Sequence, residues 1–272
     1  MPTTRVNGID LYYEVHGQGA PILGIHGTPS SALLWVDAAR ELASRGKCVI
    51  YDRRGFFRSE RPRWFTAVDL GDHVEDAAAL LDALSATPAV VIGRSTGGEI
   101  ALELAHRHPG KVKALALLEP AVFTVDPEAT AWADQLRARV LQAAEQAPSS
   151  AAETVIRAAL GDQSWESLPD RVRTAFTESS PAVLAEIRGR GLDLSDVALL
   201  FSAEDLAGIG QPTLLVSAED SPAPLRRVNE RLAVGLPRAD HVVVPGGHLI
   251  HPAHPMILDF LDRVLSPVGH PA

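Results

Sequence analysis

The sequence of 272 residues predicts an α/β protein with a mostly parallel sheet, flanking helices and a helical insertion. Three observations lead to this class. Short apolar runs that suit buried strands alternate with segments of helical periodicity. One such run, 89–93, ends in a glycine shortly before a helical pattern begins. Between about residues 123 and 207 the strand-like runs vanish, and alanine, leucine, arginine and glutamate dominate.

The chain up to the insertion alternates strands with helices. Asn7-Gly8 is a turn dipeptide beside alternating apolar residues, which predicts an antiparallel hairpin. Further along, short apolar runs predict strands, and apolar residues at helical spacing predict helices. The expected elements are a hairpin over 4–16, strands over 21–27, 47–52, 88–93 and 111–118, and helices over 33–42, 69–84 and 99–108.

The sheet pattern returns after the insertion. Two more apolar runs suit strands, and each is followed by a segment of helical periodicity. Because the insertion separates two parts of one sheet, we expect a core domain of residues 1–122 and 208–272 and a helical cap of residues 123–207. The expected later elements are strands over 212–217 and 241–245 and helices over 225–236 and 256–265.

Ser95 stands at the centre of a G-x-S-x-G motif, Gly93-Arg94-Ser95-Thr96-Gly97. A sharp strand-to-helix turn exposes a serine hydroxyl above a sheet, and the flanking glycines leave room where backbone segments meet. A bare motif also arises by chance, so an ordinary turn serine is the alternative. The strand before the motif and the helix after it favour Ser95 as a nucleophile.

Composition argues against several classes of partner. The formal charge is −9, from 34 acidic and 25 basic residues without a basic run, which disfavours nucleic acid or an anionic membrane as partner. The single Cys48 allows no disulfide framework within one chain. The N-terminus lacks an apolar signal core, and no run of about 18 apolar residues occurs. We therefore expect a cytoplasmic protein.

The order of elements and several motifs resemble the α/β-hydrolase family over essentially the whole chain. His26-Gly27-Thr28-Pro29 is similar to the family's oxyanion loop, Tyr51-Asp-Arg-Arg-Gly55 to its turn after strand four, and Pro245-Gly-Gly-His248 to its catalytic-histidine loop. The resemblance implies an eight-stranded, mostly parallel sheet with a helical cap after strand six. One departure is Phe57, which takes the place of the second glycine in the family's G-x-G-x-S turn.

A serine nucleophile needs a base to take its proton and a carboxylate to hold that base in one tautomer. His248 is the expected base, because it follows a strand and two glycines late in the chain. The family usually places an aspartate after strand seven, but Ser221 stands there, with Asp220 one position earlier. Glu119, in a Leu-Leu-Glu-Pro segment that resembles one branch of the family, is the preferred acid, and Asp220 stays open. An unpartnered carboxylate is costly at a buried strand end, which also favours a role for Glu119.

A metal cluster is the alternative interpretation of His248, since His251 and His254 follow it at intervals of three. Pro252 and Pro255 break the helical spacing that would present these side chains together, and no cysteine or acidic cluster accompanies them. We therefore expect neither a metal nor a cofactor.

The implied acyl transfer needs backbone N–H donors at the developing oxyanion. By the family's pattern, Thr28 and Thr96 supply them. Arg94 is unusual directly before the serine, and we expect it to pair with an acid behind the turn, with a substrate carboxylate as the alternative. The insertion should cover the pocket, and its lining candidates are Phe123, Trp132, Trp165 and Phe176.

The resemblance implies a cofactor-independent serine hydrolase that cleaves a carboxylic ester or lactone through an acyl-enzyme, with a small molecule as its partner. The placement of Glu119 resembles the branch that includes hydrolases of resorcylic lactones such as zearalenone. Haloalkane dehalogenases and epoxide hydrolases of this fold would have aspartate in place of Ser95. A cofactor-free perhydrolase, a carbon–carbon lyase and a non-catalytic ligand receptor are the alternatives on the same scaffold, and a homodimer stays open.

Overall fold

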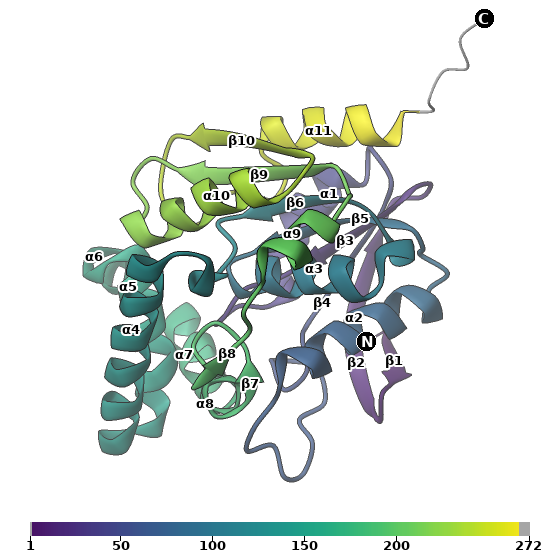
Figure 1. Cartoon of the computed structure of the whole chain (residues 1–272). Helices are drawn as coiled ribbons and strands as arrows, with labels where there is room; N and C mark the ends of the chain where they lie inside the picture. Colours follow the sequence, from purple (N-terminus) through teal and green to yellow (C-terminus); the bar gives the residue numbers. More distant parts are fainter. Residues whose placement is uncertain (1, 267–272) are drawn as a thin grey trace, which may run out of the picture.

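An eight-stranded sheet forms the centre of the structure, a computed structural model that describes residues 2–266 (Figure 1). The strand order is β1-β2-β4-β3-β5-β6-β9-β10. β2 runs antiparallel to both β1 and β4, whereas all pairs from β4 to β10 are parallel. The predicted α/β fold with a mostly parallel, eight-stranded sheet is therefore confirmed.

The strands and flanking helices lie close to the ranges that the sequence predicts. The strands are β1 (Thr3–Val6), β2 (Ile9–His16), β3 (Pro21–Ile25), β4 (Lys47–Tyr51), β5 (Ala89–Arg94), β6 (Val112–Leu118), β9 (Thr213–Ala218) and β10 (Ala239–Val244). The helices beside them are α1 (Val36–Leu42), α2 (Leu70–Ala83), α3 (Thr96–Arg107), α10 (Ala223–Gly235) and α11 (Pro255–Leu265).

Both faces of the sheet are covered by helices, as a parallel sheet requires. On β5, Val90 and Ile92 belong to an apolar cluster shared with α1 and α11. Val91, between them, belongs to the opposite cluster, which includes α2, α3 and α10. Successive strand residues point to opposite faces, so this alternation defines the two sides of the sheet at its centre. None of the helices in the described part of the chain has an apolar stretch of membrane-spanning length.

The turn residues of the N-terminal half take backbone conformations that most residues avoid. Asn7 and Gly8 both have positive φ, 46° and 80°, as the two-residue hairpin turn between β1 and β2 requires. Phe57, in the place of the family's second glycine, also adopts a positive φ of 40°. The backbone turn is therefore kept here by a residue that is strained in it, since a bulky side chain disfavours this region.

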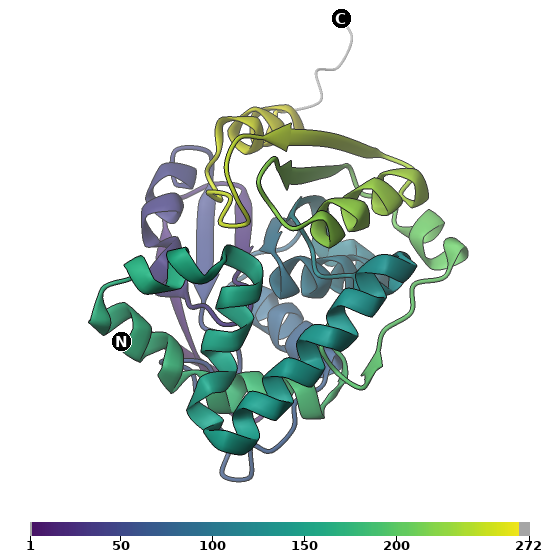
Figure 2. The same ribbon diagram turned by 90° about the vertical axis from the view of Figure 1, so that its left-hand side faces the viewer.

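The segment between β6 and β9 leaves the sheet and contains mostly helices. Figure 1 shows α4 to α8 gathered on the side toward which β9 and β10 point, and Figure 2 views them in front of the sheet. The ends of the parallel strands that carry the candidate site therefore face this segment. The helices are α4 (Pro127–Gln146), α5 (Ala151–Leu160), α6 (Asp162–Ser167), α7 (Asp170–Glu178) and α8 (Ser180–Arg188).

Two details of this segment differ from the expectation of helices alone. Arg190–Gly191 (β7) and Val197–Ala198 (β8) form a two-stranded parallel pair, which is too short to leave an apolar run in the sequence. Helix α9 (Ala203–Gly208) spans the expected boundary at 207 and contacts α10. The division into core and cap therefore stays a prediction.

The turn from β5 to α3 is packed backbone against backbone. A Cβ atom on Gly93 would lie 2.3 Å from the carbonyl oxygen of Gly97. A Cβ atom on Gly97 would lie 2.2 Å from the carbonyl oxygen of Ile25, at the end of β3. Only glycine fits at these two positions, because backbone atoms cannot move aside as a flexible side chain does.

Gly97→Ala is expected to destabilise the protein by about 1–3 kcal/mol or more, because backbone atoms leave no space for the added methyl group. Gly110→Ala is the matched control, since nothing lies within 4 Å of a Cβ atom there. Thermal unfolding should give a lower Tm for Gly97→Ala and a Tm near wild type for Gly110→Ala. Equal Tm values for the two variants would contradict the packing described here.

Candidate active site

Ser95 sits between β5 and α3 with a strained backbone, at φ 54° and ψ −127°. Hydrogen bonds hold it there. Its N–H donates to the carbonyl of Leu118 at 3.0 Å, and its own carbonyl accepts from the N–H groups of Gly98 at 2.7 Å and Ala121 at 3.1 Å. A non-glycine residue persists in such a conformation only where its surroundings over-determine it. The end of β6 thus fixes the nucleophile candidate at the wall of a cavity that Ser95 lines.

Glu119 and His248 form a buried pair at the edge of the same cavity. The Nδ1 atom of His248 lies 2.7 Å from Oε2 of Glu119. Glu119 is fully buried, and it also accepts hydrogen bonds from the N–H of Ala218 at 2.9 Å and from the hydroxyl of Ser221 at 2.7 Å. Because a carboxylate only accepts, Nδ1 of His248 carries the proton and Nε2 is left as an acceptor.

The two acid candidates occupy different environments. Asp220 is exposed, and its backbone N–H donates to the carbonyl of Gly246 at 2.9 Å. The structure brings Glu119 to His248 across 129 positions of sequence, and Ser221 supports it. The sequence contained a signal for that support, since Ser221 stands where the family usually has its acid. A serine there donates a hydrogen bond to a carboxylate that comes from the neighbouring strand end.

Ser95 and His248 line one cavity without a hydrogen bond between their side chains among the described contacts. Hydrogen bonds between a nucleophile and its base are often long or misaligned in ligand-free enzymes and tighten in the substrate complex. The arrangement of the pair is therefore compatible with proton transfer once a substrate fills the space.

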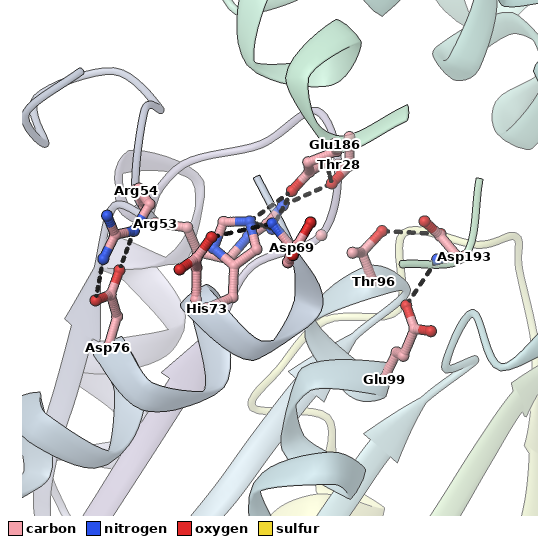
Figure 3. Close-up of polar contacts among 12 residues, drawn as sticks. Thr28, Arg53, Arg54, Asp69, His73, Asp76, Thr96, Glu99, Glu186 and Asp193 are labelled. Atoms are coloured by element: carbon pink, nitrogen blue, oxygen red, sulfur yellow. Dashed lines mark hydrogen bonds and ion pairs between the residues drawn. The ribbon is translucent and has the colours of Figure 1, made fainter. Parts of the chain in front are cut away.

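The two oxyanion candidates, Thr28 and Thr96, also line this cavity, and carboxylates hold both hydroxyl groups (Figure 3). The hydroxyl of Thr28 donates to Oε2 of Glu186 at 2.6 Å, and the hydroxyl of Thr96 donates to Oδ2 of Asp193 at 3.0 Å. Both acids belong to the segment between β6 and β9, so that segment anchors the loop that carries Thr28 and the start of α3. Sequence reasoning missed this role, because neither acid lies in a motif.

Thr28 bonds to both members of a buried ion pair, Arg53 and Glu186. Arg53 donates one hydrogen bond to Glu186 and another, at 2.6 Å, to the hydroxyl of Thr28. Nε2 of His73 lies 3.1 Å from Glu186. Burial alone would raise the pKa of the Glu186 carboxyl, but Arg53 and the hydrogen bonds from His73 and Thr28 lower it to about 2. Glu186 is therefore ionised at neutral pH and holds α8 against the core.

His26 holds the other end of the oxyanion loop. It is buried, and burial together with the nearby Arg53 charge keeps its pKa well below the ordinary value. The N–H of Arg53 donates to Nε2 of His26 at 3.0 Å, so Nδ1 carries the proton and lies 2.8 Å from the carbonyl of Gly27. A neutral histidine thus braces the loop between β3 and the turn after β4.

Asp193, which accepts the hydrogen bond from Thr96, also contacts another acidic residue, Glu99. The N–H of Asp193 donates to Oε2 of Glu99 at 3.0 Å. Burial and the nearby Glu186 carboxylate raise the pKa of Asp193 to about 7. Burial and Asp193 also raise the pKa of Glu99 well above its ordinary value. This pair therefore holds protons at a pH where exposed carboxyls have lost theirs.

The cavity has a volume of about 180 Å³ and a mostly apolar wall. Phe123 and Trp132 line it as expected, and their rings meet edge to face at 5.3 Å. Trp165 does not line it, which corrects the sequence-based expectation. Trp165 lies on α6 and borders a separate surface groove with Glu153 and Arg173. Phe176, another lining candidate, does line the cavity. The apolar wall on this side comes from α5 and α7, by way of Val155, Ile156, Ala159, Leu160, Val172 and Phe176.

Arg94 lacks the acid that the sequence led us to expect. The residue is buried, and the one hydrogen bond of its guanidinium within residues 2–266 is to the carbonyl of Ile250 at 3.4 Å. Its Cζ atom lies 5.7 Å from the centre of the Trp35 ring. Burial, without an opposing carboxylate, lowers the pKa of Arg94 to about 10. The predicted pairing with an acid behind the turn was therefore wrong.

Comparisons with known proteins cover nearly the whole chain. The family model of the alpha/beta hydrolase fold matches residues 20–255. The chain is 29% identical over 288 residues to "Putative carbamate hydrolase RutD" of Azorhizobium caulinodans. This match covers 97% of this chain and 99% of that protein. It is 41% identical over 123 residues to a non-heme chloroperoxidase of Streptomyces lividans, which covers 44% of each chain.

Two solved structures are similar over their full length. An enzyme described as Est816, which degrades N-acyl homoserine lactones, has a TM-score of 0.73 at 25% identity, over 96% of this chain and 99% of that one. A thermophilic esterase of Thermogutta terrifontis has a TM-score of 0.77 at 24% identity, over 97% of each chain. At 24% identity, the likeness to the Thermogutta esterase shows a common fold alone.

The raised pKa of Asp193 predicts a pH dependence of stability. In the unfolded chain an aspartate loses its proton near pH 4, whereas folded Asp193 keeps it up to about pH 7. The folded state therefore binds more protons in this window, and stability falls as the pH rises through it. Asp193→Asn, which cannot titrate, should gain stability relative to wild type as the pH rises from 4 to 8.

Urea unfolding at several pH values measures this difference. Asp196→Asn is the control, because Asp196 is an exposed neighbour paired with Arg137. Its stability relative to wild type should vary little over the same range. A difference between Asp193→Asn and wild type that stays constant with pH would count against the proton held at Asp193.

Proposed function

Because this chain belongs to the alpha/beta hydrolase fold family, we propose that it is a serine hydrolase that cleaves a carboxylic ester or lactone. The observation that carries the proposal is the 2.7 Å contact between His248 Nδ1 and buried Glu119, at the rim of the cavity that Ser95 lines. Ser95 is the nucleophile, His248 the base and Glu119 the acid of this proposed triad.

Each proposed role follows from the chemistry of the group. Glu119 keeps the proton of His248 on Nδ1, so Nε2 accepts the proton of the Ser95 hydroxyl as its oxygen attacks the carbonyl carbon. His248 then returns that proton to the leaving alcohol, and an acyl-enzyme remains on Ser95. A water molecule, deprotonated by His248, attacks the acyl carbon. The bond from that carbon to the Ser95 oxygen breaks, His248 returns the proton to this oxygen, and the acid is released.

Negative charge on the carbonyl oxygen is stabilised by the backbone N–H groups of Thr28 and Thr96 in this proposal. One such donor contributes about 10²–10³ in kcat in comparable enzymes. The contacts of Thr28 with Glu186 and of Thr96 with Asp193 support it, because they hold both residues before a substrate arrives. Donors that need no reorganisation stabilise the transition state most effectively.

The partner that we propose is a small-molecule ester or lactone. The cavity of about 180 Å³ is smaller than the ~300–1,000 Å³ of sites that take drug-sized ligands. A short-chain ester or a small lactone fits this space better than a bulky resorcylic lactone does. The apolar residues of α4, α5 and α7 around it support a cap that selects the substrate and shields the acyl-enzyme from bulk water.

Ser95→Ala and His248→Ala are each expected to remove nearly all turnover of p-nitrophenyl butyrate. The double variant should lose little more, because the residues of a triad act as a unit. Ser149→Ala, an exposed serine of the cap segment, is the control that should retain wild-type turnover. If Ser95→Ala hydrolyses the ester within a few-fold of wild type, the proposed mechanism is wrong.

Glu119→Gln is expected to lower kcat by about 10⁴, because glutamine no longer holds His248 in the reactive tautomer. Asp220→Asn is the matched control, and it should stay near wild type since Asp220 is exposed. Far-UV circular dichroism and Tm are measured alongside kcat to show that both variants are folded. If Asp220→Asn loses activity while Glu119→Gln retains it, the acid of the triad is Asp220, in the turn after β9.

A further inference from the structure

The guanidinium of Arg94 is a buried charge without a carboxylate partner. Arg94 is 7% exposed, and no acid within residues 2–266 pairs with it. The other buried arginine, Arg53, pairs with Glu186, and the partly buried Arg54 makes two hydrogen bonds to Asp76. Buried charges in folded proteins are normally paired, because losing water without compensation is costly. Arg94 is therefore an exception in this chain.

Arg94 lies beside the reacting centre. It directly precedes Ser95 and lines the same cavity. By the alternation along β5 its side chain is on the α1 and α11 face, between Trp35 and Ile250. The residues just before these two neighbours, Leu34 and Leu249, line the cavity as well. Arg94 is thus part of the cavity wall next to the nucleophile, on the side formed by Leu34 and Leu249.

Two more buried donors in this region lack a partner. Within the described residues, the hydroxyl of Ser30 and the Nε1–H of Trp35 make no hydrogen bond. Both residues are buried, at 4% and 1% exposure. Ser30 lines the cavity together with Arg94. Native structures satisfy nearly all buried polar groups, so these two unsatisfied donors and the single long hydrogen bond of the Arg94 guanidinium indicate a missing acceptor on this side of the cavity.

The acids of the site lie elsewhere. Asp193 bonds to Thr96 and Glu99, which belong to α3 on the opposite face of the sheet from Arg94. Glu119 is occupied by Ala218, Ser221 and His248. No side chain of the described cavity wall is therefore left to neutralise Arg94, and a ligand is the remaining source of negative charge.

We propose that Arg94, assisted by Ser30, binds a free carboxylate of the substrate. The proposal rests on the ester or lactone hydrolysis proposed above, and it narrows the substrate to esters or lactones that also bear a carboxylate. A guanidinium presents two parallel N–H donors that match the two oxygens of a carboxylate. Holding the carboxylate at this fixed point beside Ser95 orients the scissile carbonyl, which lowers KM and raises kcat/KM.

The test compares two esters that differ in this one group. The mono-p-nitrophenyl ester of glutaric acid and p-nitrophenyl valerate have acyl chains of equal length, and only the first carries a carboxylate. Wild type should show a kcat/KM about 10²-fold higher for the glutarate ester, the scale set by one buried charge pair. Arg94→Met should reduce this preference by about 10²-fold, the loss typical of removing one partner of a buried charge pair.

Two variants and a control refine the result. Arg94→Lys keeps the positive charge but lacks the two parallel N–H donors of a guanidinium, so it should retain part of the preference for the glutarate ester. Ser30→Ala should reduce the preference several-fold. Arg139→Met removes an exposed arginine of α4 and should leave kcat/KM for both esters unchanged. A wild-type enzyme without preference, or a preference that survives in Arg94→Met, would overturn the subsite.

Binding of glutarate separates the subsite from turnover and from misfolding. Calorimetry with Ser95→Ala should detect glutarate binding, and the Arg94→Met change in that background should weaken it by about 10²-fold. If neither ester is hydrolysed by wild type but glutarate binds through Arg94, the proposed hydrolysis fails and the subsite stands. If the esters are hydrolysed but glutarate does not bind, the subsite fails and the hydrolysis stands.

Discussion

The positive φ of Ser95 is the constraint on which the rest of the site depends. The carbonyl of Leu118 and the N–H of Ala121, on either side of Glu119, both bond to the Ser95 backbone. One set of contacts therefore orients the nucleophile candidate and sets the position from which Glu119 leaves β6. Gly97 packs against the end of β3, which places the oxyanion loop beside the same turn. Strain at one residue is thus held by the ends of two neighbouring strands.

The strand order explains how distant residues meet at this point. β6, β9 and β10 are consecutive neighbours in the parallel sheet, so the loops that follow them emerge at one edge. Glu119 follows β6, Ser221 follows β9 and His248 follows β10. The parallel pairing of these three strands is therefore sufficient to bring the side chains into contact at 2.7 Å.

The segment between β6 and β9 contributes more than a cover. Glu186 and Asp193 hold the side chains of the two oxyanion candidates, and Glu186 is itself held by Arg53 in a buried ion pair. Buried ion pairs of this kind are weak evidence for stability, but the contacts here join Glu186 directly to Arg53 and Thr28. The position of α8 relative to the core is therefore coupled to the geometry of the oxyanion loop. A displacement of this segment would disturb the candidate site as well as the apolar pocket.

Local patterns in the sequence were sufficient for the fold and for much of the site. Alternating apolar runs and helical periodicities report on elements a few residues long, so the sheet, the turn around Ser95 and the loop before His248 were predictable from neighbouring residues. The proposed roles of Thr28 and Thr96 came from the resemblance to the family, since these residues stand beside the motifs that carry it.

Only the tertiary structure decided which side chains meet. The sequence favoured Glu119 and left Asp220 as the alternative, and the pairing of β6 with β9 brings Glu119 rather than Asp220 to His248. Trp165 was expected in the cavity, yet the packing of α5 and α7 places it at another surface. Arg94 was expected to have an acid, and no acid of residues 2–266 pairs with it. These outcomes depend on contacts between residues far apart in the chain, which local spacing does not encode.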